Sequence, residues 1–168
     1  GLLRKSGNVN RRRWRNWRDT AGGSRQSNSR ATSCTIVRAF ADTNVIVYAQ
    51  SDDGEKTAKA IQVLEGDVVI STQVVNETIS VLTRKHGFSL ADAHQIATQL
   101  LLACEVVALD ADTIREAIRL AARHQLSHWD SLIVSAALLA SCDTLYSEDM
   151  QHGQVFDERL TVVNPFSA

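Results

Sequence analysis

The feature that most constrains the fold is a repeated alternation between short apolar runs and longer stretches with helical periodicity. Apolar runs of four to six residues, rich in Val, Ile and Leu, are separated by helical stretches of mostly ten to fifteen residues. Such alternation is typical of parallel strands joined by helical crossovers. We therefore expect an α/β fold, a three-layer α/β/α sandwich with a central, mainly parallel sheet of about five short strands, at residues 36–41, 68–71, 106–109, 143–146 and 160–163.

The charged side chains divide the chain into two parts. Residues 1–33 carry nine basic side chains and one acid, a net charge of +8, whereas residues 34–168 carry nine basic and 18 acidic side chains, a net charge of −9. We interpret residues 1–34 as a basic, disordered extension and residues 35–168 as one domain. The Arg and Trp side chains of the extension are suited to contact nucleic acid. An organelle transit peptide, binding to an acidic partner, and a translation start near Val37 are the alternatives.

Cysteine content and hydropathy bear on the compartment. Cys34, Cys104 and Cys142 are an odd number of cysteines without the spacing of a metal site, which favours buried thiols in a reducing compartment. No apolar run approaches the roughly 20 residues that a membrane-spanning helix needs. We therefore expect a cytoplasmic protein without a membrane partner.

Two acidic side chains follow predicted strands. Asp42 ends the first apolar run, and Asp149 lies shortly after the fourth. In open α/β sheets, ligands bind outside the carboxyl ends of the strands, so both acids are placed to hold a cation or a reacting group. Each has a structural alternative, with Asp42 as the N-cap of a helix that starts near Asn44 and Asp149 as a loop acid or helix cap.

Two further acids lie on predicted helices. Glu77 shares a helix face with Val74 and Val81, and an unpaired carboxylate in an apolar stripe is costly. The alternative is that Glu77 lies at the edge of the stripe and reaches solvent or a basic partner. Asp130 lies in the first turn of the most apolar helix, where a capping box with Ser127 is the structural interpretation. Capping keeps Asp130 ionised, so it does not exclude a functional role.

These four acids are predicted to converge on one rim of the sheet. Two carboxylates about 4 Å apart repel each other by roughly 4 kcal/mol at an effective dielectric constant near 20. Such a cluster is stable only if it is protonated or neutralised by a cation, and hard oxygen ligands select Mg²⁺ or Mn²⁺. A divalent cation held in this way suits phosphodiester hydrolysis, because it activates water and stabilises the charge that develops on the phosphate.

Four segments of the chain also carry a recognisable order of motifs. They are Ala-Asp-Thr-Asn-Val at 41–45, Val-Asn-Glu at 75–77 ahead of Leu-Thr-Arg-Lys at 82–85, His-Trp-Asp-Ser-Leu-Ile-Val-Ser-Ala-Ala at 128–137, and Leu-Tyr-Ser-Glu-Asp-Met-Gln-His-Gly at 145–153. In this order, and over a span from about residue 36 to residue 166, they resemble the PIN-domain ribonucleases, most closely the VapC-type toxins of bacterial toxin–antitoxin pairs.

The resemblance implies both a fold and an activity. It implies a three-layer α/β/α domain that cleaves RNA with Mg²⁺ or Mn²⁺, forms a homodimer and is held inactive by a cognate antitoxin. Asp42, Glu77 and Asp130 match the family's three core acids, and Asp149 matches its more variable fourth. By this resemblance the four are expected to be catalytic residues and metal ligands. The basic extension departs from the family pattern.

Two polar residues are expected to support the acids, and two other functions compete with the nuclease prediction. Asn44 and Ser147 match polar positions beside the acids, where the resemblance implies that they orient a carboxylate or a water. An aspartyl-phosphate phosphatase also has an Asp after its first strand, but it requires a second acid at the position of Asn44 and a Lys after a late strand. A non-catalytic RNA-binding or partner-binding module with the same fold is the other rival, and the presence of all four acids argues against it.

Overall fold

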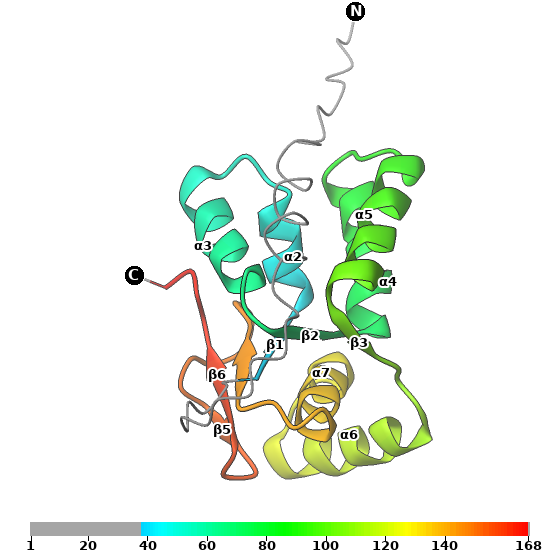
Figure 1. Ribbon diagram of the computed structural model, residues 1–168. Helices are drawn as coiled ribbons and strands as arrows, with labels where there is room; N and C mark the ends of the chain where they lie inside the picture. The colour runs from blue at the N-terminus through cyan, green and yellow to red at the C-terminus, as the bar shows by residue number, and fades with distance from the viewer. Residues whose placement is uncertain (1–37, 168) are drawn as a thin grey trace, which may run out of the picture.

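The computed structural model describes residues 38–167. Within this part of the chain, six helices cover the two faces of one six-stranded sheet (Figure 1). The predicted basic extension, residues 1–34, lies outside the described residues, as does the beginning of the first predicted strand. Among residues 38–167, no helix combines the length and the apolar character that crossing a membrane requires.

The sheet has the strand order β3-β2-β1-β4-β6-β5. Five strands are parallel, and β5 runs antiparallel to β6 at one edge. This confirms a mainly parallel sheet but corrects the expected number of strands from about five to six. The additional strand has two residues, too few to show any periodicity in the sequence. The strands are β1 (Ala39–Ala41), β2 (Val68–Ser71), β3 (Glu105–Val107), β4 (Thr144–Tyr146), β5 (Val155–Phe156) and β6 (Leu160–Val163).

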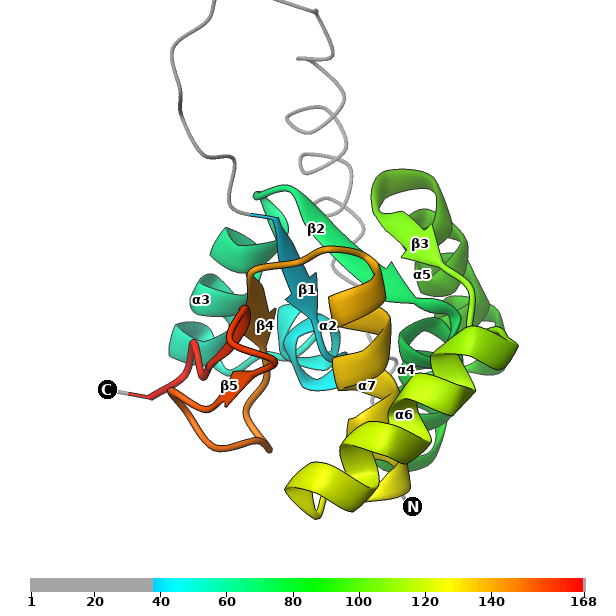
Figure 2. The ribbon, with the colours of Figure 1, turned by 90° about the horizontal axis from the view of Figure 1, so that it is seen from below.

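The helices form the two outer layers. Helices α2 to α5 lie on one side of the sheet, and α6 and α7 lie on the other (Figures 1 and 2). This arrangement confirms the predicted three-layer sandwich. The helices are α2 (Thr43–Ala49), α3 (Gly54–Leu64), α4 (Thr72–Lys85), α5 (Leu90–Ala103), α6 (Ala111–His124) and α7 (His128–Leu139).

Polar side chains fix where several helices begin. Ser71, Ser89 and Ser127 are the N-caps of α4, α5 and α7, and each side chain accepts a hydrogen bond from a backbone N–H in the first turn. Asp42 caps α2 in the same manner, which confirms the N-cap interpretation of this acid. At the other end of α4, Gly87 adopts a φ of +69°, which glycine tolerates at a helix end.

The sheet extends from β1 in both directions, so the strand order reverses between β1 and β4. The chain passes from β1 to β2 on one side, and it later returns to place β4 on the other. The register pairs Ala41 with Tyr146, so the two strands end at the same level. The backbone N–H of Asp42 donates to the carbonyl of Tyr146 at 3.0 Å. The segments that follow β1 and β4 are therefore adjacent at the carboxyl edge, where open α/β sheets bind ligands.

The core fills the space between the sheet and its helices. Phe40, Ile70 and Leu145 of the central strands are fully buried. Helix α7 is buried from Ser131 to Leu138, as its uniformly apolar sequence predicts. Cys142 is buried in this core and the partly buried Cys104 packs against it. Burial raises the pKa of both thiols to about 11, which is consistent with unreactive cysteines.

The packing of α5 gives a matched test of this core. Leu100 is fully buried, whereas Leu102, two residues further along the same helix, is 73% exposed. Leu100→Ala is expected to lower the free energy of unfolding by about 2–5 kcal/mol, because it removes buried apolar surface and leaves a cavity. Leu102→Ala is expected to change it by less than about 0.5 kcal/mol. Urea denaturation measures both values, and equal effects would contradict this orientation of α5.

Candidate active site

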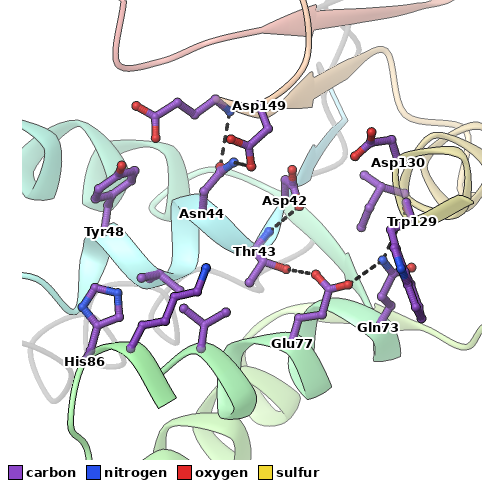
Figure 3. A pocket seen from close by; sticks show the side chains of 15 residues that line it. Asp42, Thr43, Asn44, Tyr48, Gln73, Glu77, His86, Trp129, Asp130 and Asp149 are labelled. Carbon is purple, nitrogen blue, oxygen red and sulfur yellow. Dashed lines mark hydrogen bonds between the residues drawn. The ribbon is translucent and has the colours of Figure 1, made fainter. Parts of the chain in front are cut away.

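A pocket of about 360 Å³ opens at the carboxyl ends of β1 and β4. Its walls come from α2, α4, the start of α7 and the segment after β4 (Figure 3). All four acids predicted from the sequence line it, together with a fifth, Glu148. The acids that line the pocket are Asp42, Glu77, Asp130, Glu148 and Asp149. The structure thus brings the predicted acids to one concave surface.

Asp42 is the most buried of these acids, with 8% of its surface exposed. Its carboxylate accepts a hydrogen bond from the Ser147 hydroxyl at 2.8 Å and another from the backbone N–H of Thr43 at 2.6 Å. Burial raises the pKa of Asp42 to about 6; these two hydrogen bonds oppose the rise, and the nearby charges of Glu77 and Asp149 add to it.

The two predicted supporting residues both contact the acids. Ser147 is fully buried, so it lies behind Asp42 rather than on the pocket wall, and its hydroxyl oxygen also accepts the backbone N–H of Asp149 at 3.3 Å. The amide of Asn44 donates to the Asp149 carboxylate at 3.2 Å, and its carbonyl accepts the backbone N–H of Glu148 at 3.4 Å. Through these contacts the segment after β4 is attached to the start of α2.

Glu77 is half-buried rather than enclosed by the apolar stripe that contains Val74. The Thr43 hydroxyl donates to one carboxylate oxygen at 2.8 Å, and the Gln73 amide donates to the other at 2.8 Å (Figure 3). The sequence motifs do not single out Thr43 or Gln73. Gln73 lies four residues before Glu77 on the same helix, a spacing that indicates such a contact, whereas only the fold brings Thr43 to Glu77.

Asp130 lies at the start of α7 and is also half-buried. The Ser127 hydroxyl donates to the Asp130 carboxylate at 2.7 Å, and the Ser127 hydroxyl oxygen accepts a hydrogen bond from the backbone N–H of Asp130 at 3.1 Å. The predicted capping interaction is therefore present. Because Asp130 also lines the pocket, its capping role and its place among the acids coexist.

The negative charge of the four predicted acids is not neutralised within the described residues. Each carboxylate accepts a hydrogen bond from a neutral side chain, and none forms an ion pair with a cation of residues 38–167. Glu148 differs, because Lys56 Nζ lies 2.5 Å from its Oε1. Among residues 38–167, the pocket therefore combines four acids without an ion-pair partner and one acid, Glu148, that is paired with Lys56.

A divalent cation fits the donor chemistry of this pocket. The available side-chain ligands are hard carboxylate oxygens, which suit Mg²⁺ or Mn²⁺. Among residues 38–167, no three acidic, histidine or cysteine side chains are close enough together to hold one metal ion between them. Mg²⁺ commonly binds through one or two carboxylates and keeps several waters, so a closed three-ligand cage is not required.

The sheet order and the pocket define an α/β/α domain with an acidic site at the point where the strand order reverses. The family model of the PIN domain matches residues 39–155, and the chain belongs to this family. The matched range includes all four predicted acids and both supporting polar residues.

Several solved structures share the fold. A toxin–antitoxin complex from Klebsiella pneumoniae has 20% sequence identity and a TM-score of 0.60, and the match covers 77% of this chain and 99% of that chain. VapC20 of Mycobacterium tuberculosis, a sarcin–ricin loop cleaving toxin, has 21% identity, a TM-score of 0.56 and coverages of 66% and 89%. FitAcB from Neisseria gonorrhoeae has 19% identity, a TM-score of 0.58 and coverages of 77% and 99%. A comparison with curated protein sequences gives no significant match.

The raised pKa of Asp42 predicts a pH-dependent cost of folding. The folded protein holds this proton more tightly than the unfolded chain does, so ionisation destabilises the fold as the pH rises from about 4 through about 6. Asp42→Asn removes the charge. With EDTA present, the variant is expected to match the parent near pH 4 and to exceed its free energy of unfolding by about 2–3 kcal/mol at pH 7.

Urea denaturation across this pH range measures the difference. Asp143→Asn is the control, because Asp143 is exposed and lies at the amino-terminal end of β4, whereas the pocket lies at its carboxyl end. If the free energies of unfolding of Asp42→Asn and the parent differ by a constant amount from pH 4 to pH 7, the raised pKa of Asp42 is refuted.

Proposed function

We propose that this chain is a metal-dependent endoribonuclease and the toxin of a toxin–antitoxin pair. The observation that carries the proposal is the presence, in one pocket of a PIN domain, of four carboxylates that form no ion pair within residues 38–167. Similar folds support the choice of substrate and role, because one is a sarcin–ricin loop cleaving toxin and another is part of a toxin–antitoxin complex.

In this proposal Asp42, Glu77, Asp130 and Asp149 are the catalytic acids and would hold Mg²⁺ or Mn²⁺. A bound cation supplies positive charge that activates water and stabilises the phosphate as negative charge develops on it. It would also remove the mutual repulsion of the acids and lower the pKa of Asp42, since an opposite charge favours the ionised form.

The protein's own contribution is to hold these carboxylates in fixed positions. Ser147 and the Thr43 N–H orient Asp42, while the Thr43 side chain and Gln73 orient Glu77. Asn44 orients Asp149. These donors are neutral, so they restrict the carboxylates without cancelling the charge that attracts a cation. This combination of orientation and retained charge is what a cation-binding catalytic pocket requires.

Protein partners belong to the same proposal. A cognate antitoxin and a second copy of this chain would pack against apolar side chains that are exposed on α5 and α6, which include Leu101, Leu102, Ile114 and Ile118. Covering such side chains removes apolar surface from water and stabilises association.

The rival functions agree less well with the pocket. A phosphatase that forms an aspartyl-phosphate requires an acid where this chain has Asn44, and the Asn44 amide is already engaged by Asp149 and the backbone of Glu148. A non-catalytic binding module has no need for four carboxylates that no cation of residues 38–167 pairs with. The decisive distinction between these functions is cleavage itself.

Cleavage of a mixed RNA pool tests the proposal. The parent protein is expected to cut RNA with Mg²⁺ or Mn²⁺ and not with EDTA. Asp42→Asn and Asp130→Asn are expected to lower the cleavage rate by more than about 100-fold, because loss of a metal-holding carboxylate exceeds the 10–100-fold effect typical of residues that only orient ligands. Gel analysis of labelled products measures the rate and defines the product ends.

The Asp143→Asn variant serves again as the control, because it removes one acid outside the pocket, and its rate should equal that of the parent. A folded parent that cuts no RNA in the pool with either metal would contradict the nuclease proposal. Equal activity with and without EDTA would contradict its metal dependence.

Ser147→Ala tests whether orientation of Asp42 matters for activity. The variant loses the hydroxyl that donates to Asp42 and accepts from the backbone of Asp149, so a fall in the cleavage rate of roughly 10- to 100-fold is expected. Ser135→Ala is the matched control, because Ser135 is also fully buried but donates to the carbonyl of Thr113. Rate assays at saturating Mg²⁺ compare the two, and equal losses in both variants would show a general packing effect instead.

A further inference from the structure

A large aromatic side chain next to the acids is exposed to solvent. Trp129 lines the pocket, and 62% of its surface is exposed (Figure 3). It is the single tryptophan among residues 38–167. Exposing this much indole to water forgoes the stabilisation that burial would give, so the fold itself does not account for the placement of the ring.

The backbone around Trp129 is fixed although its ring is exposed. Trp129 lies in the first turn of α7, which Ser127 caps, and its carbonyl accepts a hydrogen bond from the Gln73 amide at 3.4 Å. The same amide donates to Glu77. The His128 ring contacts the indole edge-on, with 5.4 Å between centroids. The backbone that carries the indole is thus held by hydrogen bonds directly beside Asp130.

The pocket also contains a cation that no acid of the described residues neutralises. Lys85, at the end of α4, lines the pocket with His86 and forms no ion pair within residues 38–167. Lys56 offers a contrast, since it is bound to Glu148. One concave surface thus holds an aromatic face, an ammonium group that is unpaired within residues 38–167, and a group of acids. In a nucleic acid strand these match a base, a phosphate, and a phosphate that a cation bridges to the acids.

We propose that Trp129 is the stacking platform for a nucleobase of single-stranded RNA next to the phosphate that is cut. The inference rests on the proposed nuclease function and adds a substrate-binding residue to it. Trp129 and Asp130 are consecutive, so a phosphodiester held at the acids brings a neighbouring base to the indole. The Lys85 ammonium group is placed to contact another phosphate of the strand. Stacking tolerates any base, so this subsite selects unpaired RNA rather than a sequence.

A protein partner is the competing occupant of the indole. A peptide that covered Trp129 with apolar side chains would also cover the adjoining carboxylates and Lys85, and would desolvate their charges without a matching partner. A nucleotide supplies a planar apolar face and an anion together. The mixed chemistry of the surface therefore favours RNA.

Fluorescence of Trp129 tests stacking directly. In the full chain, Trp14→Phe and Trp17→Phe leave Trp129 as the sole tryptophan, and Asp42→Asn suppresses cutting. Titration with a short oligouridylate in Mg²⁺ is expected to quench the emission, because a stacked base contacts the indole face. An abasic oligomer of the same length and charge should not quench it. Equal quenching by the two oligomers, or quenching by neither when binding is seen by anisotropy of labelled RNA, would overturn the proposal.

Kinetics give an independent readout on chains that keep Asp42. Trp129→Ala and Trp129→Leu are expected to raise KM for unpaired RNA by roughly 5- to 150-fold, the range for loss of one base–aromatic stack, with a much smaller change in kcat. Trp129→Phe keeps a ring and should recover most of the affinity. Leu139→Ala is the control, because Leu139 is exposed on the same helix but does not line the pocket.

The outcomes separate the two proposals. If the parent cuts RNA and KM is the same in all Trp129 variants, the stacking site is refuted and the nuclease function stands. If the Trp129 variants change only the oligomeric state, seen by light scattering, the indole is a protein contact and the stacking site is likewise refuted. If the parent neither cuts nor binds RNA, both proposals fail.

Discussion

The hydrogen bond from Ser147 to Asp42 is the contact on which the pocket depends. It joins the residues that directly follow β1 and β4, the two strands between which the order of the sheet reverses. A buried carboxylate at such a point is costly unless it is satisfied, and a fully buried hydroxyl satisfies it without cancelling its charge. The same hydroxyl accepts the backbone N–H of Asp149, so one side chain positions an acid from each strand. The site and the switch in strand order are thus parts of one arrangement.

The fold was predictable because its dominant signal is local. Short apolar runs separated by helical stretches identified all five parallel strands and the two outer layers, and capping residues such as Ser89 and Ser127 located helix starts. The antiparallel strand β5 was missed because two residues carry no periodicity, and its pairing with β6 is set by the turn between them. The third strand is Glu105–Val107 rather than the predicted 106–109, because ladder hydrogen bonds and not hydropathy decide where a strand begins and ends.

The candidate site was predictable in its acids but not in their surroundings. Asp42, Glu77, Asp130 and Asp149 stood out through their joint position at one rim of the predicted sheet and through the order of motifs that contains them, and all four line one pocket. The contact of Thr43 with Glu77 spans 34 positions in the chain, and no sequence pattern contains such a pairing. Asp42 also shows that the structural and functional interpretations of a residue can both hold, since it caps α2 and faces the pocket.

The two edges of the sheet have a consequence for how this protein can associate. One edge is β5, with two residues, and the other is β3, with three, where Glu105 is also paired with Arg38. Unpaired N–H and C=O groups along an edge invite a strand from another molecule, and short, charged edges offer few of them. Sheet extension into a ribbon of molecules is therefore disfavoured. Assembly is directed to helix faces and loops, where side-chain shape rather than backbone pairing selects the partner.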